Sequence, residues 1–218
     1  RSARPSKHAA GCPAGAGIAA REGPLVAPAA AAGAADGGGG AANWWASEEP
    51  PARLRDVSEG LLQRTEVSLQ GGGHTEDLVA ITDPEHNFFS GHGAERVWPA
   101  SLALARHLME RFGGGRAVGL KAVELGAGTG LPSLVLARLG CTAAVLTDVT
   151  WVVQLLEYNV QANFAEHSQC RPRSLPLRWG SSSDVGLVLE DLGGAPDLVI
   201  AADVVYRLED LEALMETL

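Results

Sequence analysis

An acidic residue followed by three alternating glycines gives this chain its clearest capacity for chemistry. Glu124 precedes glycines at positions 126, 128 and 130. Glycine readily adopts positive φ and, having no Cβ, lets a ligand approach the backbone. Residues 121–125 form a short apolar run typical of a buried parallel strand, and residues 131–139 carry apolar side chains at helical spacing. The N–H groups and positive dipole end of that helix would face the turn, which predicts a nucleotide-type site.

The spacing of the glycines separates the classes of nucleotide. The dinucleotide fingerprint needs its third glycine where this chain has Leu131, and no Gly-Lys-Ser/Thr follows for a triphosphate loop. S-adenosyl-L-methionine has no phosphate but carries an amino-acid end, beside whose amino group Glu124 would supply negative charge. The backbone residues expected to approach that end are Gly126, Ala127, Gly128 and Gly130. Another nucleotide and a purely structural turn remain the alternatives.

Asp148 is the expected partner of the ribose. It lies 18 residues after Gly130, at the end of a second apolar run over residues 142–147. Its two oxygens could accept hydrogen bonds from both ribose hydroxyls. Asp148 alone would equally suit a nicotinamide ribose, so the glycine spacing decides between the two cofactors.

The elements that must position these residues repeat as strand and helix. We expect an α/β fold with a doubly wound, mostly parallel, Rossmann-like sheet, preceded by an N-terminal β-hairpin. Right-handed crossovers bring the carboxyl ends of the strands to one crevice. The expected hairpin strands are 64–70 and 78–82, the core strands are 121–125, 142–147, 175–179 and 197–202, and the helices are 99–112, 131–139, 149–163 and 208–218.

Composition divides the chain into three parts. Residues 1–42 form an Ala/Gly/Pro-rich leader too poor in large apolar residues to fold, residues 43–97 an extension containing the hairpin, and residues 98–218 the cofactor-binding domain. Whether the leader targets an organelle is left open. Ending after a fourth core strand would leave an apolar sheet edge, so we expect C-terminal strands to be missing from this chain.

Charge and cysteine content narrow the partners. Residues 1–42 carry four Lys/Arg and two Asp/Glu, about +2, whereas the remainder carries 13 and 24, or −11. This acidic balance argues against nucleic acid and suits a basic protein substrate, although a solvated acidic surface is an equal explanation. No apolar run is long enough to span a membrane. Three scattered cysteines and six histidines show no metal-ligand spacing and no disulfide framework, which favours a reducing compartment.

Several motifs together resemble a known family. The stretch VELGAGTGLPSLVLARLG is similar to the first motif of seven-β-strand (class I) methyltransferases. The stretches VWPAS from 97, LRWG from 177 and ADVVY from 202 resemble the branch of protein-lysine methyltransferases related to those of valosin-containing protein, Hsp70, elongation factors and calmodulin. The resemblance covers residues 60–218 and implies further C-terminal strands.

The resemblance assigns roles to five more residues. It implies that Trp98 contacts the cofactor, that Trp179 borders the adenine and that the small Ala202 lets the backbone pass close to the cofactor. It places Asp203 and Tyr206 beside the transferred methyl group as catalytic residues. The alternatives are core roles for the two tryptophans and Tyr206, and a helix cap for Asp203.

The sequence thus predicts a protein-lysine N-methyltransferase that uses S-adenosyl-L-methionine without a metal. A histidine or small-molecule methyltransferase and an inactive, truncated cofactor-binding module are the alternatives. We expect a cytoplasmic monomer with a protein substrate, no nucleic-acid partner and no membrane association.

Overall fold

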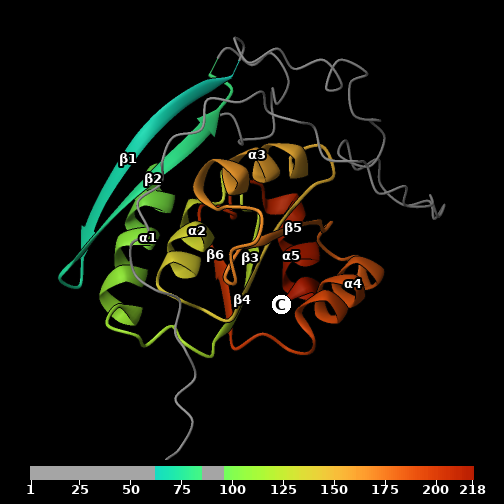
Figure 1. Ribbon diagram of the computed structural model, residues 1–218. Helices are drawn as coiled ribbons and strands as arrows, with labels where there is room; N and C mark the ends of the chain where they lie inside the picture. The colour runs from blue at the N-terminus through green and yellow to red at the C-terminus, as the bar shows by residue number, and fades with distance from the viewer. Residues whose placement is uncertain (1–61, 85–95) are drawn as a thin grey trace, which may run out of the picture.

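The computed structural model describes residues 62–84 and 96–218, which form a hairpin and an α/β domain (Figure 1). The hairpin precedes four parallel strands that alternate with helices. The elements are β1 (Gln63–Gly71), β2 (His74–Thr82), α1 (Pro99–Phe112), β3 (Lys121–Leu125), α2 (Leu131–Arg138), β4 (Ala143–Asp148), α3 (Val153–Asn163), β5 (Arg173–Pro176), α4 (Ser182–Leu192), β6 (Leu198–Ala201), η3 (Leu208–Asp210) and α5 (Leu211–Thr217).

The order in which the chain adds strands to the sheet reverses at β3. Its strand order is β5-β4-β3-β6, and all three pairings are parallel. Val123 in β3 faces Val145 of β4 on one side and Val199 of β6 on the other. The chain therefore moves outward from β3 through β4 to β5 and then crosses to the opposite side of β3. Ligands of such sheets bind beyond the carboxyl ends of the strands at this switch point.

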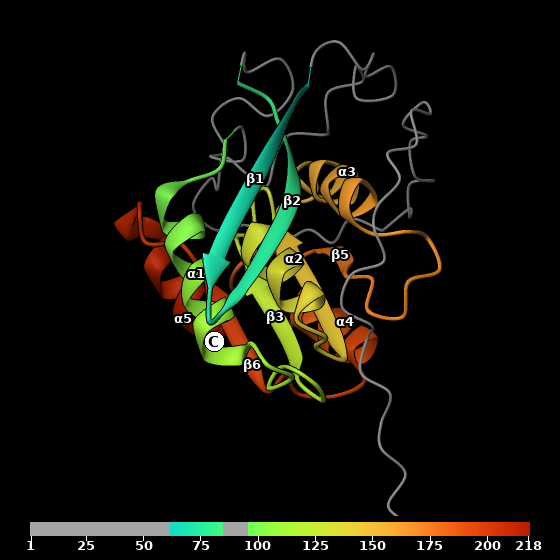
Figure 2. The ribbon, with the colours of Figure 1, turned by 60° about the vertical axis from the view of Figure 1, so that its left-hand side comes forward.

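Helices cover both faces of the sheet. Helices α1, α2 and α3 lie on one side, and α4 and α5 on the other (Figures 1 and 2). Alternate strand residues serve the two faces, since Ala122 and Leu146 belong to the core under α1–α3, whereas Val123 and Val145 join a second core with Leu214 of α5. The doubly wound α/β fold is confirmed, and the continuous apolar strands follow from burial on both faces.

The predicted hairpin is also confirmed. Strands β1 and β2 pair antiparallel from Gln63–Thr82 to Gly71–His74, with Gly72 and Gly73 at positive φ in the turn. The hairpin crosses in front of α1, α2 and α3 in Figure 2, and its apolar face, including Leu69 and Leu78, belongs to the core on that side.

Two asparagines of α3 bind the outer edge of β2. Asn159 accepts a hydrogen bond from the Ile81 N–H (2.7 Å) and donates to the Ile81 carbonyl (3.0 Å). Asn163 repeats the pattern with Val79, at 2.8 and 2.7 Å. Both side chains are almost fully buried. The hairpin is thereby attached to the domain through backbone groups whose burial would otherwise be costly.

Most predicted boundaries agree with the structure, and four predictions do not, the first being the start of β2, which lies at His74 rather than at 78. Helix α1 and strand β3 have the predicted limits, whereas α3 begins at Val153 rather than 149 because a turn intervenes, with the Val152 N–H bonded to the Val149 carbonyl (2.9 Å). The strand predicted at 175–179 has the wrong bounds, since β5 runs from Arg173 to Pro176 and Trp179 lies in the following loop. The serine turn predicted after Gly180 is the start of helix α4.

The remaining expectations concern the N-terminal leader, the cysteines and membrane-spanning helices. The leader at 1–42 and residues 43–61 and 85–95 of the 43–97 extension lie outside the described residues. Cys141 is a buried free thiol. Among the described helices, none combines the length and hydropathy that crossing a membrane requires.

Candidate functional site

The glycine turn is bonded to strand β4 and is closed by a hydrogen bond of its own. Three glycines in the turn, Gly126, Gly128 and Gly130, have φ of 60°, 56° and 74°. The Ala127 N–H donates to the carbonyl of Thr147 in β4 (2.9 Å), and the Gly130 N–H closes the turn on the Ala127 carbonyl (2.7 Å). Left-handed conformations at three positions explain why the sequence places glycines there.

The glycines at the two ends of this turn face different surroundings. A methyl group built on Gly126 would lie 3.0 Å from Val204 Cγ1 and 3.3 Å from Trp179 Cζ2, beyond the carboxyl ends of the strands. A methyl group on Gly130 would instead overlap Leu146 inside the core. Gly126 therefore lets Val204 and Trp179 approach the turn closely, and Gly130 lets α2 pack closely on β4. A cofactor contact at Gly130 stays a prediction.

Glu124 connects β3 to the start of α2. Its side chain is 1% exposed, and its Oε2 accepts a hydrogen bond from the Ser133 N–H (3.0 Å). Burial raises the pKa of Glu124 to about 8, against the hydrogen bonds from Ser133, and the nearby Asp148 raises it further. The carboxyl group is therefore largely protonated at neutral pH in this structure, and a cation beside it would favour its ionisation.

Asp148 bridges the glycine turn and the start of the next loop. Its Oδ2 accepts from the Gly128 N–H (2.8 Å) and its Oδ1 from the Val149 N–H (2.7 Å). Burial raises the pKa of Asp148 to about 6, although both hydrogen bonds lower it. Each carboxylate oxygen has a second lone pair, so the residue can accept two further donors such as a pair of ribose hydroxyls.

The segment after β6 lies against the glycine turn. Asp203 has a φ of 59°, the one positive value at a non-glycine residue within 62–84 and 96–218, and it is exposed. Tyr206 is 62% exposed, and partial burial and the charge of Asp148 raise its pKa. Val204 lies close to Gly126 and the charge of Asp148 acts on Tyr206, so the predicted catalytic segment and the predicted ribose partner lie near one another. Ala202 occupies the bend between them and β6.

The two predicted tryptophans differ in what surrounds them. Trp179 packs against the second core and approaches Gly126. Trp98 is the N-cap residue of α1, with the Arg96 guanidinium 5.2 Å from the centre of its ring. The structure therefore brings Trp179 to the glycine turn, while the cofactor contact of Trp98 stays a prediction.

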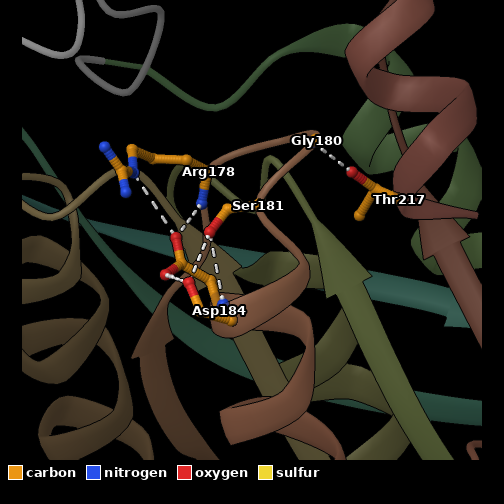
Figure 3. A network of polar contacts seen from close by, with 6 residues as sticks. Arg178, Gly180, Ser181, Asp184 and Thr217 are labelled. Atoms are coloured by element: carbon orange, nitrogen blue, oxygen red, sulfur yellow. Dashed lines mark hydrogen bonds and ion pairs between the residues drawn. The ribbon is translucent and has the colours of Figure 1, made fainter. Parts of the chain in front are cut away.

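Sequence reasoning missed the residues that hold the Trp179 loop. Asp184 and Thr217 bind the backbone on either side of Trp179, from α4 and α5 (Figure 3). The spacing Ser181-x-x-Asp184 is a helix-start signal that could have revealed α4. Nothing in the local sequence pattern indicates the contact of Thr217, because it joins residues 37 positions apart.

Comparison with known families identifies the domain. A family described as lysine methyltransferase matches residues 81–218, which is more than half of the chain. The chain belongs to this lysine methyltransferase family. The matched region contains every residue predicted for the site, from Trp98 to Tyr206, and it also includes Asp184 and Thr217.

Several curated relatives match a comparable share of the chain. The protein N-lysine methyltransferase METTL21A of Mus musculus is 37% identical over 123 residues, 56% of this chain and 52% of its own length. METTL21A of Danio rerio is 36% identical over 56% of this chain and 52% of the relative, and the protein-lysine methyltransferase METTL21E of Bos taurus is 33% identical over 56% and 41%. The chain thus spans about half the length of these relatives.

The described histidine, cysteine, aspartate and glutamate residues form no group of three or more that could hold a metal ion.

Proposed function

We propose that this protein transfers a methyl group from S-adenosyl-L-methionine to a lysine side chain of a protein. The observation that carries the proposal is the meeting of three loops around Gly126. A methyl group built there would touch Val204 of the predicted acceptor segment and Trp179 of the predicted adenine loop. Membership of the lysine methyltransferase family and the names of the METTL21 relatives support the same activity.

The residues of the glycine turn and its neighbours fit the cofactor. The glycine backbone of the turn, the remaining lone pairs of Asp148 and the aromatic face of Trp179 suit the amino-acid end, the ribose and the adenine respectively. When bound, S-adenosyl-L-methionine supplies a methyl group on a positively charged sulfur, which needs no nucleophile from the protein. Further predicted contacts are Trp98, Glu124, Ala127, Gly128, Gly130 and Ala202.

The acceptor side must orient a lysine amine and allow it to lose a proton. The exposed carboxylate of Asp203 can attract the ammonium group and hold the amine in line, and the proton can leave to solvent. The raised pKa keeps the Tyr206 hydroxyl protonated at neutral pH, so it can donate one hydrogen bond or accept one from the amine.

The partners follow from the same reasoning. We propose a protein substrate with a basic segment around the acceptor lysine, since residues 43–218 carry a net charge of −11. A cytoplasmic monomer without a nucleic-acid partner remains part of the proposal.

Labelling tests the activity. The protein is incubated with S-adenosyl-L-methionine carrying a labelled methyl group and a cell lysate, and labelled protein is hydrolysed to amino acids. We expect the label in methylated lysine. Label in methylhistidine or in a small molecule would overturn the lysine assignment, and failure of S-adenosylhomocysteine to bind in calorimetry would overturn the cofactor assignment.

A further inference from the structure

We propose that Asp184 and Thr217 are positioning residues that hold Trp179 against the glycine turn for binding the adenine ring. The inference rests on the proposed function and extends it to two residues outside the site. Figure 3 shows both side chains reaching the same loop, Asp184 from the start of α4 and Thr217 from the end of α5.

Asp184 binds the loop on the amino side of Trp179. Its Oδ2 accepts a hydrogen bond from the Arg178 N–H (3.0 Å), and the Arg178 guanidinium lies 3.5 Å from the same oxygen. The Asp184 N–H donates to the Ser181 hydroxyl (3.3 Å), which caps α4. The carboxylate thus joins the first turn of a helix to the loop that precedes it, and a charged acceptor makes the stronger kind of backbone hydrogen bond.

Thr217 binds the loop on the carboxyl side of Trp179. Its hydroxyl oxygen accepts from the Gly180 N–H (2.8 Å) and its proton goes to the Ala213 carbonyl one turn earlier (2.8 Å). Gly180 has a φ of 77°, and a methyl group there would lie 3.3 Å from Ala213 Cβ. The loop therefore lies directly on α5, in a backbone conformation that favours glycine.

The two contacts enclose Trp179 between fixed neighbours. The N–H groups of residues 178 and 180 are both bonded to side chains on helices, which restricts the backbone torsions around Trp179. Its ring then stays at the position where it approaches Gly126. An aromatic surface held in place before binding lowers the entropy cost of stacking on a purine. Neither Asp184 nor Thr217 needs to touch the cofactor to affect its affinity.

The substitution Thr217→Val tests this role, and two closely matched variants serve as its controls. Valine keeps the shape of threonine but removes the acceptor for Gly180, Thr217→Ser keeps the hydroxyl, and Thr142→Val makes the same exchange at an exposed site in another part of the fold. Asp184→Ala removes the other contact. Binding of S-adenosylhomocysteine is measured by calorimetry, and hydrogen exchange of the Gly180 amide is measured in the ligand-free protein.

We expect Thr217→Val and Asp184→Ala each to weaken binding about threefold to tenfold. Thr217→Ser and Thr142→Val should retain the original affinity, and exchange at Gly180 should accelerate only in Thr217→Val. In a Trp179→Ala background, Thr217→Val should weaken binding no further, because its effect passes through the ring.

Additive losses in the Trp179→Ala background, or unchanged affinity in Thr217→Val, would overturn the positioning role. A wild-type protein that binds no S-adenosylhomocysteine would overturn the proposed function and this role with it. The two failures are therefore distinguishable.

Discussion

The proposed cofactor side and the proposed acceptor side of the site are built in different ways. On the cofactor side, Glu124 is 1% exposed and Leu131 is fully buried. On the acceptor side, Val205 and Tyr206 are each 62% exposed, and Asp203 holds a left-handed backbone without being glycine. One side is thus formed by core packing, whereas the other presents side chains and backbone strain to solvent.

This difference suggests that folding and chemistry are carried by separate parts of the site. A non-glycine residue at positive φ costs free energy and is retained where the side chain at that place is needed. Changes on the acceptor side should therefore affect turnover more than stability, and changes in the glycine turn should do the reverse. Four predictions test this division.

The largest effect is expected from Asp203→Asn. Asparagine tolerates the left-handed conformation, so the fold should persist, but it lacks the charge that attracts the amine. We expect methyl transfer to fall about 10²-fold or more, with the affinity for S-adenosylhomocysteine unchanged. The measurements are labelled-methyl incorporation and calorimetry. A matching loss of thermal stability would remove the distinction between the two sides.

Gly130→Ala should affect mainly stability. The added methyl group would overlap Leu146, and the φ of 74° disfavours alanine. We expect the free energy of unfolding to fall by about 2–4 kcal/mol in urea denaturation. The control is Gly114→Ala, which has a φ of 70° but open space around it, and should cost only about 1–2 kcal/mol. Equal losses in both variants would show that packing at Gly130 contributes nothing.

The pH dependence of stability tests the burial of Glu124. Its pKa rises from 4.5 to about 8 on folding, so the folded state binds more protons over this range and stability falls as pH rises. Between about pH 6 and pH 9, the free energy of unfolding should decrease by about 2–3 kcal/mol from this residue. Glu124→Gln cannot ionise and should flatten the profile. Parallel profiles for the two proteins would contradict the assignment.

The smallest effect is expected from Tyr206→Phe. Removing the hydroxyl deletes one hydrogen bond to the amine but keeps the ring, so turnover should fall about threefold to tenfold. Stability should not change, because the side chain is largely exposed. A larger loss of cofactor affinity than of turnover would move Tyr206 to the cofactor side of the comparison.

The sequence predicted the strand, turn and helix of the proposed cofactor side well because their signals are local. Glycines at alternate positions, an apolar strand before them and Pro132 in the first turn of α2 all lie within a dozen residues. Helix α1 was equally predictable, with Pro99 at its start and Gly113 at its end. Each of these features depends on backbone preferences that nearby residues set.

Other features depended on contacts that no local pattern contains. The sequence places β5 too far along the chain because only Ser174 of its four residues is buried, whereas residues 175–179 have a more apolar pattern. The orientation of Gly130 toward Leu146 and the contact of Thr217 with Gly180 arise only when α2 and α5 pack on their neighbours. The direction of a side chain in space is therefore the information that spacing alone omits.

The paired asparagines of α3 have a wider consequence for how a helix can close a sheet. Four helical residues advance about 6 Å and two strand residues about 6.8 Å. The spacing of the Asn159 and Asn163 amides therefore nearly matches that of their partners, Ile81 and Val79 respectively. The remaining mismatch accumulates with each repeat, so about two such asparagines can bond to the same strand edge. Within that limit, an Asn-x-x-x-Asn pair on a helix could be used in design to cover the free edge of a strand without adding another strand.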